Sequence, residues 1–405
     1  MGRLFKGIGT LAGVVPEGVL RKQGSQMDDA GLMHDAWLLV SEGRIEAFGS
    51  GGVIPSADEV IDCQGGMLMP AWCDSHTHIV YSGSRDGEFI DKINGLSYEE
   101  IAARGGGILN SADRLHEASE DELFDEAMVR VREMTAQGTG AIEIKSGYGL
   151  NPADEMKMLR VIDRIKHSTQ ALVRSTFLGA HAVGRGFTHA DYVDAVCDMM
   201  PQAASLADFV DVFCERGFFN VEDAARIMEA GARCRLRPKI HANQLAVSGG
   251  VQVGVAHGAL SVDHLENAGD AEIQALMDSS TMATMLPGSS FFLRMPYGRA
   301  REFVDAGLGV ALASDYNPGS SPSGDMRFIM ALGCIQMRLT PERAFNACTL
   351  NSAYAMGVSD VTGSVTVGKR ADLVLTQPGW TLTKLPYLHH SLYIRQVYLA
   401  GTAIL

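Results

Sequence analysis

Short apolar runs alternate with helical patterns through the middle of the chain. Eight such runs can be counted, each of a length that suits one strand. They cover residues 67–80, 141–149, 172–181, 209–217, 236–244, 260–266, 281–288 and 309–317. Amphipathic helical patterns lie between them, for example at 120–138 and 220–233, with acidic residues early and glycine near the end. The alternation predicts an α/β fold of repeated βα units, most economically a closed TIM (β/α)8 barrel, with an open doubly wound sheet as the alternative.

The two ends of the chain have a different texture. Residues 36–40, 44–49, 363–375 and 392–405 alternate apolar and polar positions around glycine turns, which is typical of strands. We therefore expect a small composite β-sandwich domain built from residues 1–66 and 359–405, and a barrel domain over 67–358. The connection 81–118, with Gly105, Gly106 and Gly107, is too long for a simple βα unit, and we expect it to be a mobile active-site loop.

Polar residues gather where the predicted strands end. His76 and His78 are two residues apart on the first strand, so both imidazoles point to one side. His241 ends the fifth strand and Asp315 the eighth, and in a barrel these ends meet at one face. Taken singly, a histidine pair, a core histidine or a helix-capping aspartate is ordinary. The conjunction of the four predicts one metal ion held by these residues.

Two further roles follow from the same positions. His264 ends the sixth strand, where it could take a proton from water, stabilise a tetrahedral oxyanion, or merely support a metal ligand from behind. Asp315 could bind a metal through one oxygen and pass a proton to a leaving nitrogen through the other. A bound metal ion can bring the pKa of its water to about 7 and so supply hydroxide at neutral pH.

Composition narrows the class of ligand. The 405 residues carry a formal net charge of −14 and show no basic stripe, which argues against nucleic-acid binding and favours a small-molecule substrate. No run approaches a membrane-spanning length, and the first residues lack the apolar core of a signal peptide. We therefore expect no membrane partner and a cytoplasmic location.

The motifs DSHTH, HANQ, VDHLE and ASDYNPGS, in this order, resemble the amidohydrolase superfamily over nearly the whole chain. More narrowly, HTHIVYSGSR, SGYGL, TFLGAHAV and DYNPGSSP resemble the imidazolonepropionases, ring-opening enzymes of histidine degradation. That resemblance implies one Zn²⁺ or Fe³⁺ ion per subunit, hydrolysis of 4-imidazolone-5-propanoate to N-formimidoyl-L-glutamate, and a homodimer.

The same resemblance implies a set of substrate-binding residues. Arg85 is the position that it assigns to the substrate's propionate, and a guanidinium fork suits a carboxylate. The other implied contacts are Tyr148, His181, Gln244, Asn317, Gly319 and Ser320. The plainer interpretations are a solvated loop charge for Arg85, a packing role for Tyr148, and an ordinary Pro-Gly turn at 317–320.

Three positions leave alternatives open. Some relatives have glutamate where this chain has Gln244, and an amide cannot act as a base, so base duty falls to His264 while Gln244 bonds the substrate ring. Asn243 replaces a common aspartate. Lys145 raises a rival hypothesis, because binuclear amidohydrolases carry a carbamylated lysine on a barrel strand.

The competing functions are another cyclic-amide hydrolase, an aminohydrolase acting on a heterocycle, and a scaffold without activity. A scaffold would normally have lost metal ligands, and here all four candidate ligands remain.

Overall fold

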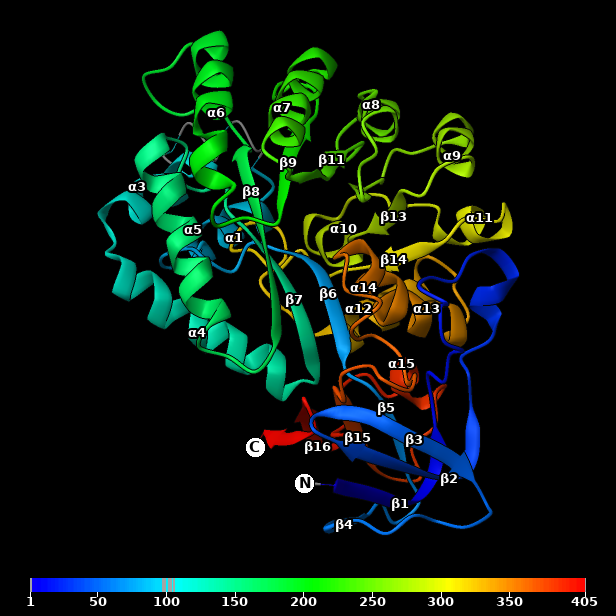
Figure 1. The fold of residues 1–405 in the computed structure, drawn as a ribbon. Coiled ribbons are helices and arrows are strands. Elements are labelled where there is room, and N and C mark those ends of the chain that lie inside the picture. Colours follow the sequence, from blue (N-terminus) through cyan, green and yellow to red (C-terminus); the bar gives the residue numbers. More distant parts are fainter. Residues whose placement is uncertain (1, 97–99, 101–103, 105, 405) are drawn as a thin grey trace.

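Parallel strands of the middle of the chain form the upper part of the computed structural model, which describes residues 2–96, 100, 104 and 106–404 (Figure 1). They follow one path, β14-β13-β12-β11-β9-β8-β7-β6, with β10 beside β9. Their bounds are β6 Trp72–Thr77, β7 Thr139–Lys145, β8 Leu172–Ala180, β9 Phe209–Cys214, β10 Arg237–Pro238, β11 Ile240–Ala242, β12 Ser261–His264, β13 Met282–Met285 and β14 Val310–Leu312. Each of the eight predicted runs contains one strand of this path.

The first and last strands meet and close the sheet. Thr77 and Tyr316 form a parallel bridge just beyond β14. The amide of His78 donates to the carbonyl of Tyr316 (2.9 Å), and the amide of Asp315 donates to the carbonyl of His76 (3.0 Å). The prediction of a closed barrel is thus confirmed, and the open doubly wound sheet is excluded.

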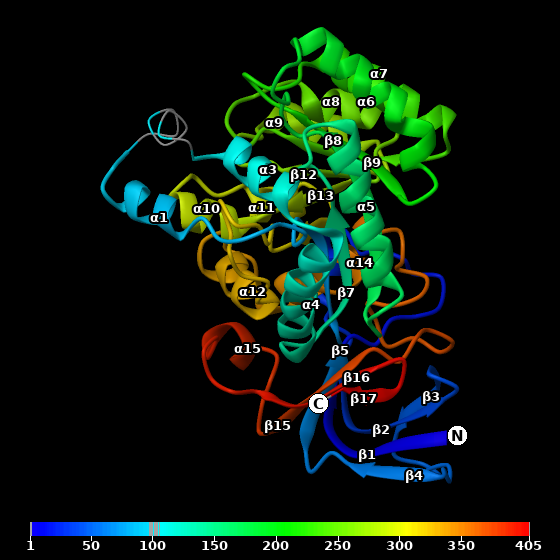
Figure 2. The same cartoon turned by 90° about the vertical axis from the view of Figure 1, so that its left-hand side faces the viewer.

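Helices surround the barrel (Figures 1 and 2), and its strands are therefore buried on both faces. The predicted pattern at 120–138 is α4, which begins after a Ser119/Glu122 capping box, and that at 220–233 is α7, capped by Asn220. The helices are α1 Asp86–Ile93, α3 Ile108–Glu117, α4 Glu120–Ala136, α5 Pro152–Lys166, α6 His189–Ala203, α7 Val221–Arg233, α8 Gly250–Ala256, α9 Asp270–Met277, α10 Pro287–Leu293, α11 Ala300–Asp305, α12 Met326–Ile335, α13 Pro341–Cys348, α14 Leu350–Ala355 and α15 Lys384–Tyr387, with a 3-10 helix at Gly24–Asp28. Among the described residues, none of these helices is both long and apolar enough to cross a membrane.

The two chain ends form a separate β domain, drawn below the barrel in Figure 1, as expected. Its strands are hydrogen-bonded in one eight-stranded sheet of order β17-β16-β15-β5-β1-β2-β3, with β4 beside β1. They are β1 Gly2–Leu11, β2 Met33–Ser41, β3 Arg44–Ser50, β4 Glu59–Asp62, β5 Gly66–Pro70, β15 Leu373–Pro378, β16 Ile394–Leu399 and β17 Thr402–Ile404. The indole of Trp72 at the start of the barrel donates to the hydroxyl of Tyr393 (2.8 Å), which joins the two parts.

Two segments differ in detail from the sequence-based expectation. The run 67–80 is two strands: β5 pairs with β1 and β15 of the end sheet, and β6 begins the barrel after Ala71. The connection 81–118 is no bare loop, because α1 and α3 lie within it. Residues 97–99, 101–103 and 105, which include Gly105, are outside the described part of the chain.

Candidate metal centre

The strand ends of the barrel carry unusual backbone geometry. His264 has φ 89°, Asp315 has φ 54°, and Asn243, just after β11, has φ 59°. Residues with a side chain rarely adopt positive φ, and such strain is concentrated at functional sites. His264 and Asp315 therefore lie at positions of backbone strain, and this backbone conformation sets the direction of their side chains.

One group of donor atoms comes from both ends of the barrel sequence. Nε2 of His76 lies 3.2 Å from Nε2 of His78. Oδ1 of Asp315 lies 3.6 Å from the first of these nitrogens and 3.5 Å from the second. All three residues are buried. Two nitrogens and one carboxylate oxygen at this spacing are a donor set that fits a single metal ion.

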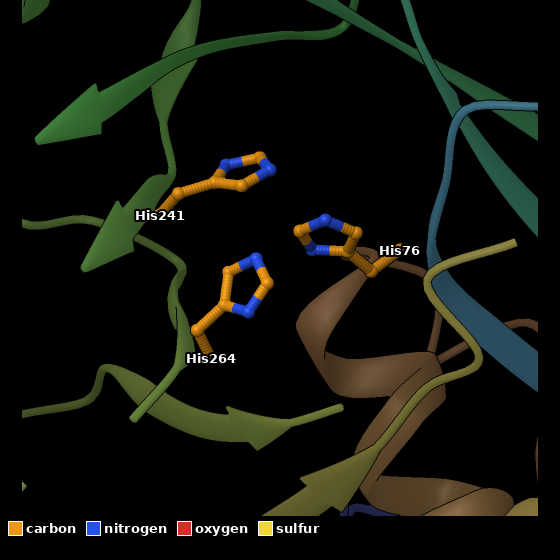
Figure 3. A group of neighbouring side chains, drawn as sticks. All are labelled: His76, His241 and His264. Carbon is orange, nitrogen blue, oxygen red and sulfur yellow. The ribbon is translucent and has the colours of Figure 1, made fainter. Parts of the chain in front are cut away.

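A second group shares His76. Ring atoms of His76, His241 and His264 lie within 4.8 Å of one another, and the three rings converge in Figure 3. Both ring nitrogens of His241 are buried and lack a hydrogen-bond partner among the described residues, but Nδ1 lies 3.0 Å from Oδ2 of Asp211, so Nε2 is the nitrogen left for a metal. The structure thus places the predicted ligands in two donor groups that share His76: one adds His78 and Asp315, and the other adds His241 together with His264.

The charge states suit metal binding. Burial, and after it the nearby Lys145 ammonium, holds the pKa of His76 well below its usual range. Burial, and after it His181, does the same for the pKa of His78. Both imidazoles are therefore neutral, which is the form that ligates metals. The Nδ1–H of His76 donates to Oδ2 of Asp263 (2.7 Å), which leaves Nε2 with its lone pair toward the site.

His264 has a carboxylate partner that was not predicted. Its Nδ1 lies 3.4 Å from Oε1 of Glu266, so the ring nitrogen that points toward His76 and His241 in Figure 3 is Nε2. Burial opposes protonation of His264, but Glu266 outweighs it and raises the pKa of the imidazole. Ser290 donates to the same carboxylate oxygen (3.3 Å). Oε2 of Glu266 is buried without a hydrogen-bond partner among the described residues.

Asp315 is held from its other side. Oδ2 accepts from the hydroxyl of Ser289 and lies 3.4 Å from that of Ser320, while Oδ1 faces His76 and His78. Burial raises the pKa of the Asp315 carboxyl. One oxygen is thus free for a metal while the other is hydrogen-bonded, which agrees with the two-oxygen role considered for this residue.

Lys145 lacks the surroundings of a carbamylated lysine. Its Nζ is completely buried and donates to Oε1 of Glu143 (2.6 Å) and Oδ2 of Asp211 (2.8 Å). Burial alone would lower the pKa of this amine, but Asp211 and Glu143 outweigh it and raise the pKa above its ordinary value. The surrounding carboxylates therefore favour the ammonium form of Lys145.

Two of the substrate residues implied by resemblance border the donor atoms. The ring of His181 stacks on that of His78 at 5.2 Å and 18°. Tyr148 lies 5.6 Å from the His181 ring and 6.0 Å from that of His78. The Nδ1–H of His181 donates to the carbonyl of Gly147 (3.0 Å), so its Nε2 is the nitrogen available for a ligand.

Arg85 and Gly319 are neighbours, although 234 residues apart in sequence. A Cβ built on Gly319 would lie 2.3 Å from Nη1 of Arg85, so a side chain at position 319 would displace this guanidinium. The Arg85 guanidinium is paired with Glu88 (2.5 Å), and Lys92, which was not predicted, donates to the carbonyl of Gly319 (2.6 Å). Two cations, Arg85 and Lys92, and one carboxylate, Glu88, therefore lie around Gly319.

The remaining predicted residues are engaged locally. Oδ1 of Asn317 accepts from the amides of Gly319 and Ser320 (both 2.8 Å), so the 317–320 segment is also an ordinary side-chain-stabilised turn. Gln244 is half-buried, and its backbone carbonyl accepts from the side-chain amide of Asn267 (2.7 Å). Asn243 turns its Oδ1 toward the amide of Ser248 (3.2 Å).

Sequence reasoning missed the charged residues beneath the histidines. They are Glu143, Asp211, Lys239 and Asp263, all fully buried, together with Glu266. A signal existed, because Asp211 and Asp263 interrupt otherwise apolar strands at VDV and VDH. A charged residue inside a buried strand must be paired or functional.

Known proteins of similar sequence are consistent with this geometry. The Amidohydrolase family model matches residues 219–404. The chain is 47% identical to the imidazolonepropionase of Flavobacterium johnsoniae over 99% of both chains. It is 39% identical to that of Geobacillus kaustophilus over 90% of this chain and 88% of the relative.

Solved structures share the fold. A zinc-bound adenosine deaminase from Xanthomonas campestris superposes with a TM-score of 0.73 at 17% identity, covering 99% of this chain and 92% of its own. A triazine hydrolase variant gives 0.77 at 15% identity, covering 100% and 94%. With the curated relatives matched over their whole length, the chain belongs to the imidazolonepropionase family of the amidohydrolases, which are hydrolases.

Proposed function

We propose that this enzyme hydrolyses the cyclic amide of 4-imidazolone-5-propanoate to N-formimidoyl-L-glutamate in histidine degradation, with one Zn²⁺ or Fe³⁺ ion per subunit. The observation that carries the proposal is the convergence of Nε2 of His76, Nε2 of His78 and Oδ1 of Asp315 within 3.6 Å, in a chain of this family. His241 would complete the ligand set with its unpartnered Nε2. When bound, the ion would polarise the amide carbonyl and acidify a water molecule.

The surrounding side chains would perform the proton transfers. His264 accepts the proton of the attacking water at Nε2, and Glu266 behind Nδ1 stabilises the resulting imidazolium. Gln244 cannot take that proton, but its amide can bond the substrate ring. Asp315 then relays this proton from the His264 imidazolium to the leaving ring nitrogen, so that the C–N bond breaks, the nitrogen departs as the neutral N–H of the formimidoyl group, and His264 returns to its neutral form.

Substrate selection would come from the edge of the site. Arg85, whose Nε and Nη2 donate to Glu88, would offer Nη1 to the propionate beside Gly319. Tyr148 and His181 border the ring position next to His78. Asn317 shapes the turn that brings Gly319 to Arg85.

The test is turnover of the substrate, formed in situ from urocanate by urocanase. We expect its ring absorbance to fall on addition of the enzyme, the fall to stop after chelation, and activity to return with added metal. Absence of chelator-sensitive loss would overturn the assignment. We also propose that the protein is a homodimer and is cytoplasmic. Light scattering tests the dimer, because it should give twice the mass of the 43.4 kDa chain.

A further inference from the structure

A layer of charged side chains lies directly beneath the histidines of the candidate metal centre. It is contributed by β7, β9, the residue before β11, and β12. Each member is 0% exposed: Glu143, Lys145, Asp211, Lys239 and Asp263. Burial of charge is costly unless every group is paired, so such a layer needs a reason beyond packing.

Two ammonium groups hold the layer together. Nζ of Lys145 lies 2.6 Å from Glu143, 2.8 Å from Asp211 and 3.6 Å from Asp263. Nζ of Lys239 contacts Glu143, donates to the carbonyl of Ser75 (3.0 Å) and lies 3.7 Å from Asp263. Two cations thus face three carboxylates, which gives a formal charge of −1.

The layer reaches the metal centre at two points. Oδ2 of Asp263 accepts from Nδ1 of His76 (2.7 Å), and Oδ2 of Asp211 lies 3.0 Å from Nδ1 of His241. The same two carboxylate oxygens face the ammonium of Lys145. A carboxylate behind Nδ1 fixes the ring and its tautomer, and leaves Nε2 for the metal.

We propose that Lys145, Asp211 and Asp263 are one positioning unit for the metal centre: a single ammonium aligns the two carboxylates that orient His76 and His241. The inference rests on the metal site proposed above. It assigns a purpose to Lys145 that excludes a bridging carbamate, because carbamylation would replace a positive charge by a negative one and change the layer from −1 to −3. The unit would thereby fix the orientation of His76, from the first barrel strand, relative to that of His241, from the fifth.

The test measures metal affinity rather than activity. Metal-free Asp263→Asn and Asp211→Asn are titrated with Zn²⁺ against a chromophoric chelator, after circular dichroism shows that each is folded. We expect each to bind zinc roughly 10- to 100-fold more weakly than the unaltered protein. Because the two carboxylates act through one ammonium, the double variant should lose less than the product of the two single losses. A full product would overturn the shared unit.

Asp372→Asn is the matched control. Asp372 is an equally buried carboxylate that accepts from the amide of Ala400 and the hydroxyl of Thr362 (both 2.9 Å), next to β15 and remote from the site. This variant should lose thermal stability and keep its zinc affinity. Folded Asp211 and Asp263 variants that bind zinc as the unaltered protein does would make the layer purely structural. Failure of the unaltered protein to bind zinc or iron would instead refute the metal site itself.

Discussion

Replacement of His264 distinguishes between two possible roles of this residue, general base and metal ligand. The ring lies beside His76 and His241, close enough to be a ligand, yet Glu266 occupies its Nδ1 and its Nε2 faces the site (Figure 3). Because the proposed ligands His76, His78, His241 and Asp315 would provide four donors, His264 should be dispensable for binding. We expect His264→Asn to retain one ion per chain and to lose turnover.

The size of the loss follows from the role. A positioned general base contributes roughly 10²- to 10⁴-fold to a rate, and each factor of ten is about 1.4 kcal/mol of barrier. Loss of His264 should therefore raise the barrier by about 3 to 5 kcal/mol with little change in KM. Asparagine fills part of the buried space, so that cavity formation is limited.

The assay pairs kcat, from ring absorbance, with metal content by mass spectrometry after gel filtration. His241→Ala serves as the comparison, since removal of a ligand should cost the metal itself. Glu266→Gln should keep the metal and lower kcat with KM unchanged, because the amide supports the imidazolium less well. If His264→Asn loses metal as His241→Ala does, His264 is a ligand and the assignment of the base is wrong.

Three further outcomes are expected. Arg85→Ala should raise KM by about 10²-fold or more with a smaller change in kcat, because a charge-assisted contact of about 3 kcal/mol is lost, and steady-state kinetics will show whether kcat falls instead. Gln244→Ala should lower kcat/KM yet leave the acidic limb of the pH profile in place, since that limb belongs to His264; a shift of the limb would implicate Gln244. Glu155 is fully buried, and burial raises its pKa to about 7 from 4.5. Its contribution to folding is therefore greatest below pH 4.5 and is lost as pH rises toward 7, so the stability advantage of the unaltered protein over Glu155→Gln should shrink by about 3 kcal/mol across that window in urea unfolding. A constant difference would contradict the titration of Glu155.

The barrel could be predicted because its signal is local. Each strand is a short apolar run, each helix has its own cap, and the polar residue at a strand end marks the active face of this fold. His76, His78, His241 and Asp315 were predicted as ligands in this way, although they are contributed by strands far apart in sequence.

The charged layer could not be predicted because it consists of ion pairs between residues that are far apart in sequence. Lys145 and Asp211 are 66 residues apart, and no periodicity connects them. Lys145 alone suggested a bridging carbamate, whereas the carboxylates around it favour an ammonium. Likewise, the break between β5 and β6 at Ala71 is set by partners in the C-terminal strands rather than by the apolar run itself.

The most direct test of a single-metal hydrolase is activity measured against metal content. Metal-free enzyme is reloaded in steps with Zn²⁺ or with Fe²⁺, and the iron series is run both with air and without air. Turnover of 4-imidazolone-5-propanoate is followed at each step. We expect activity to rise in proportion to bound metal and to reach its maximum at one ion per chain. A maximum at two ions, or activity that persists without metal, would contradict it.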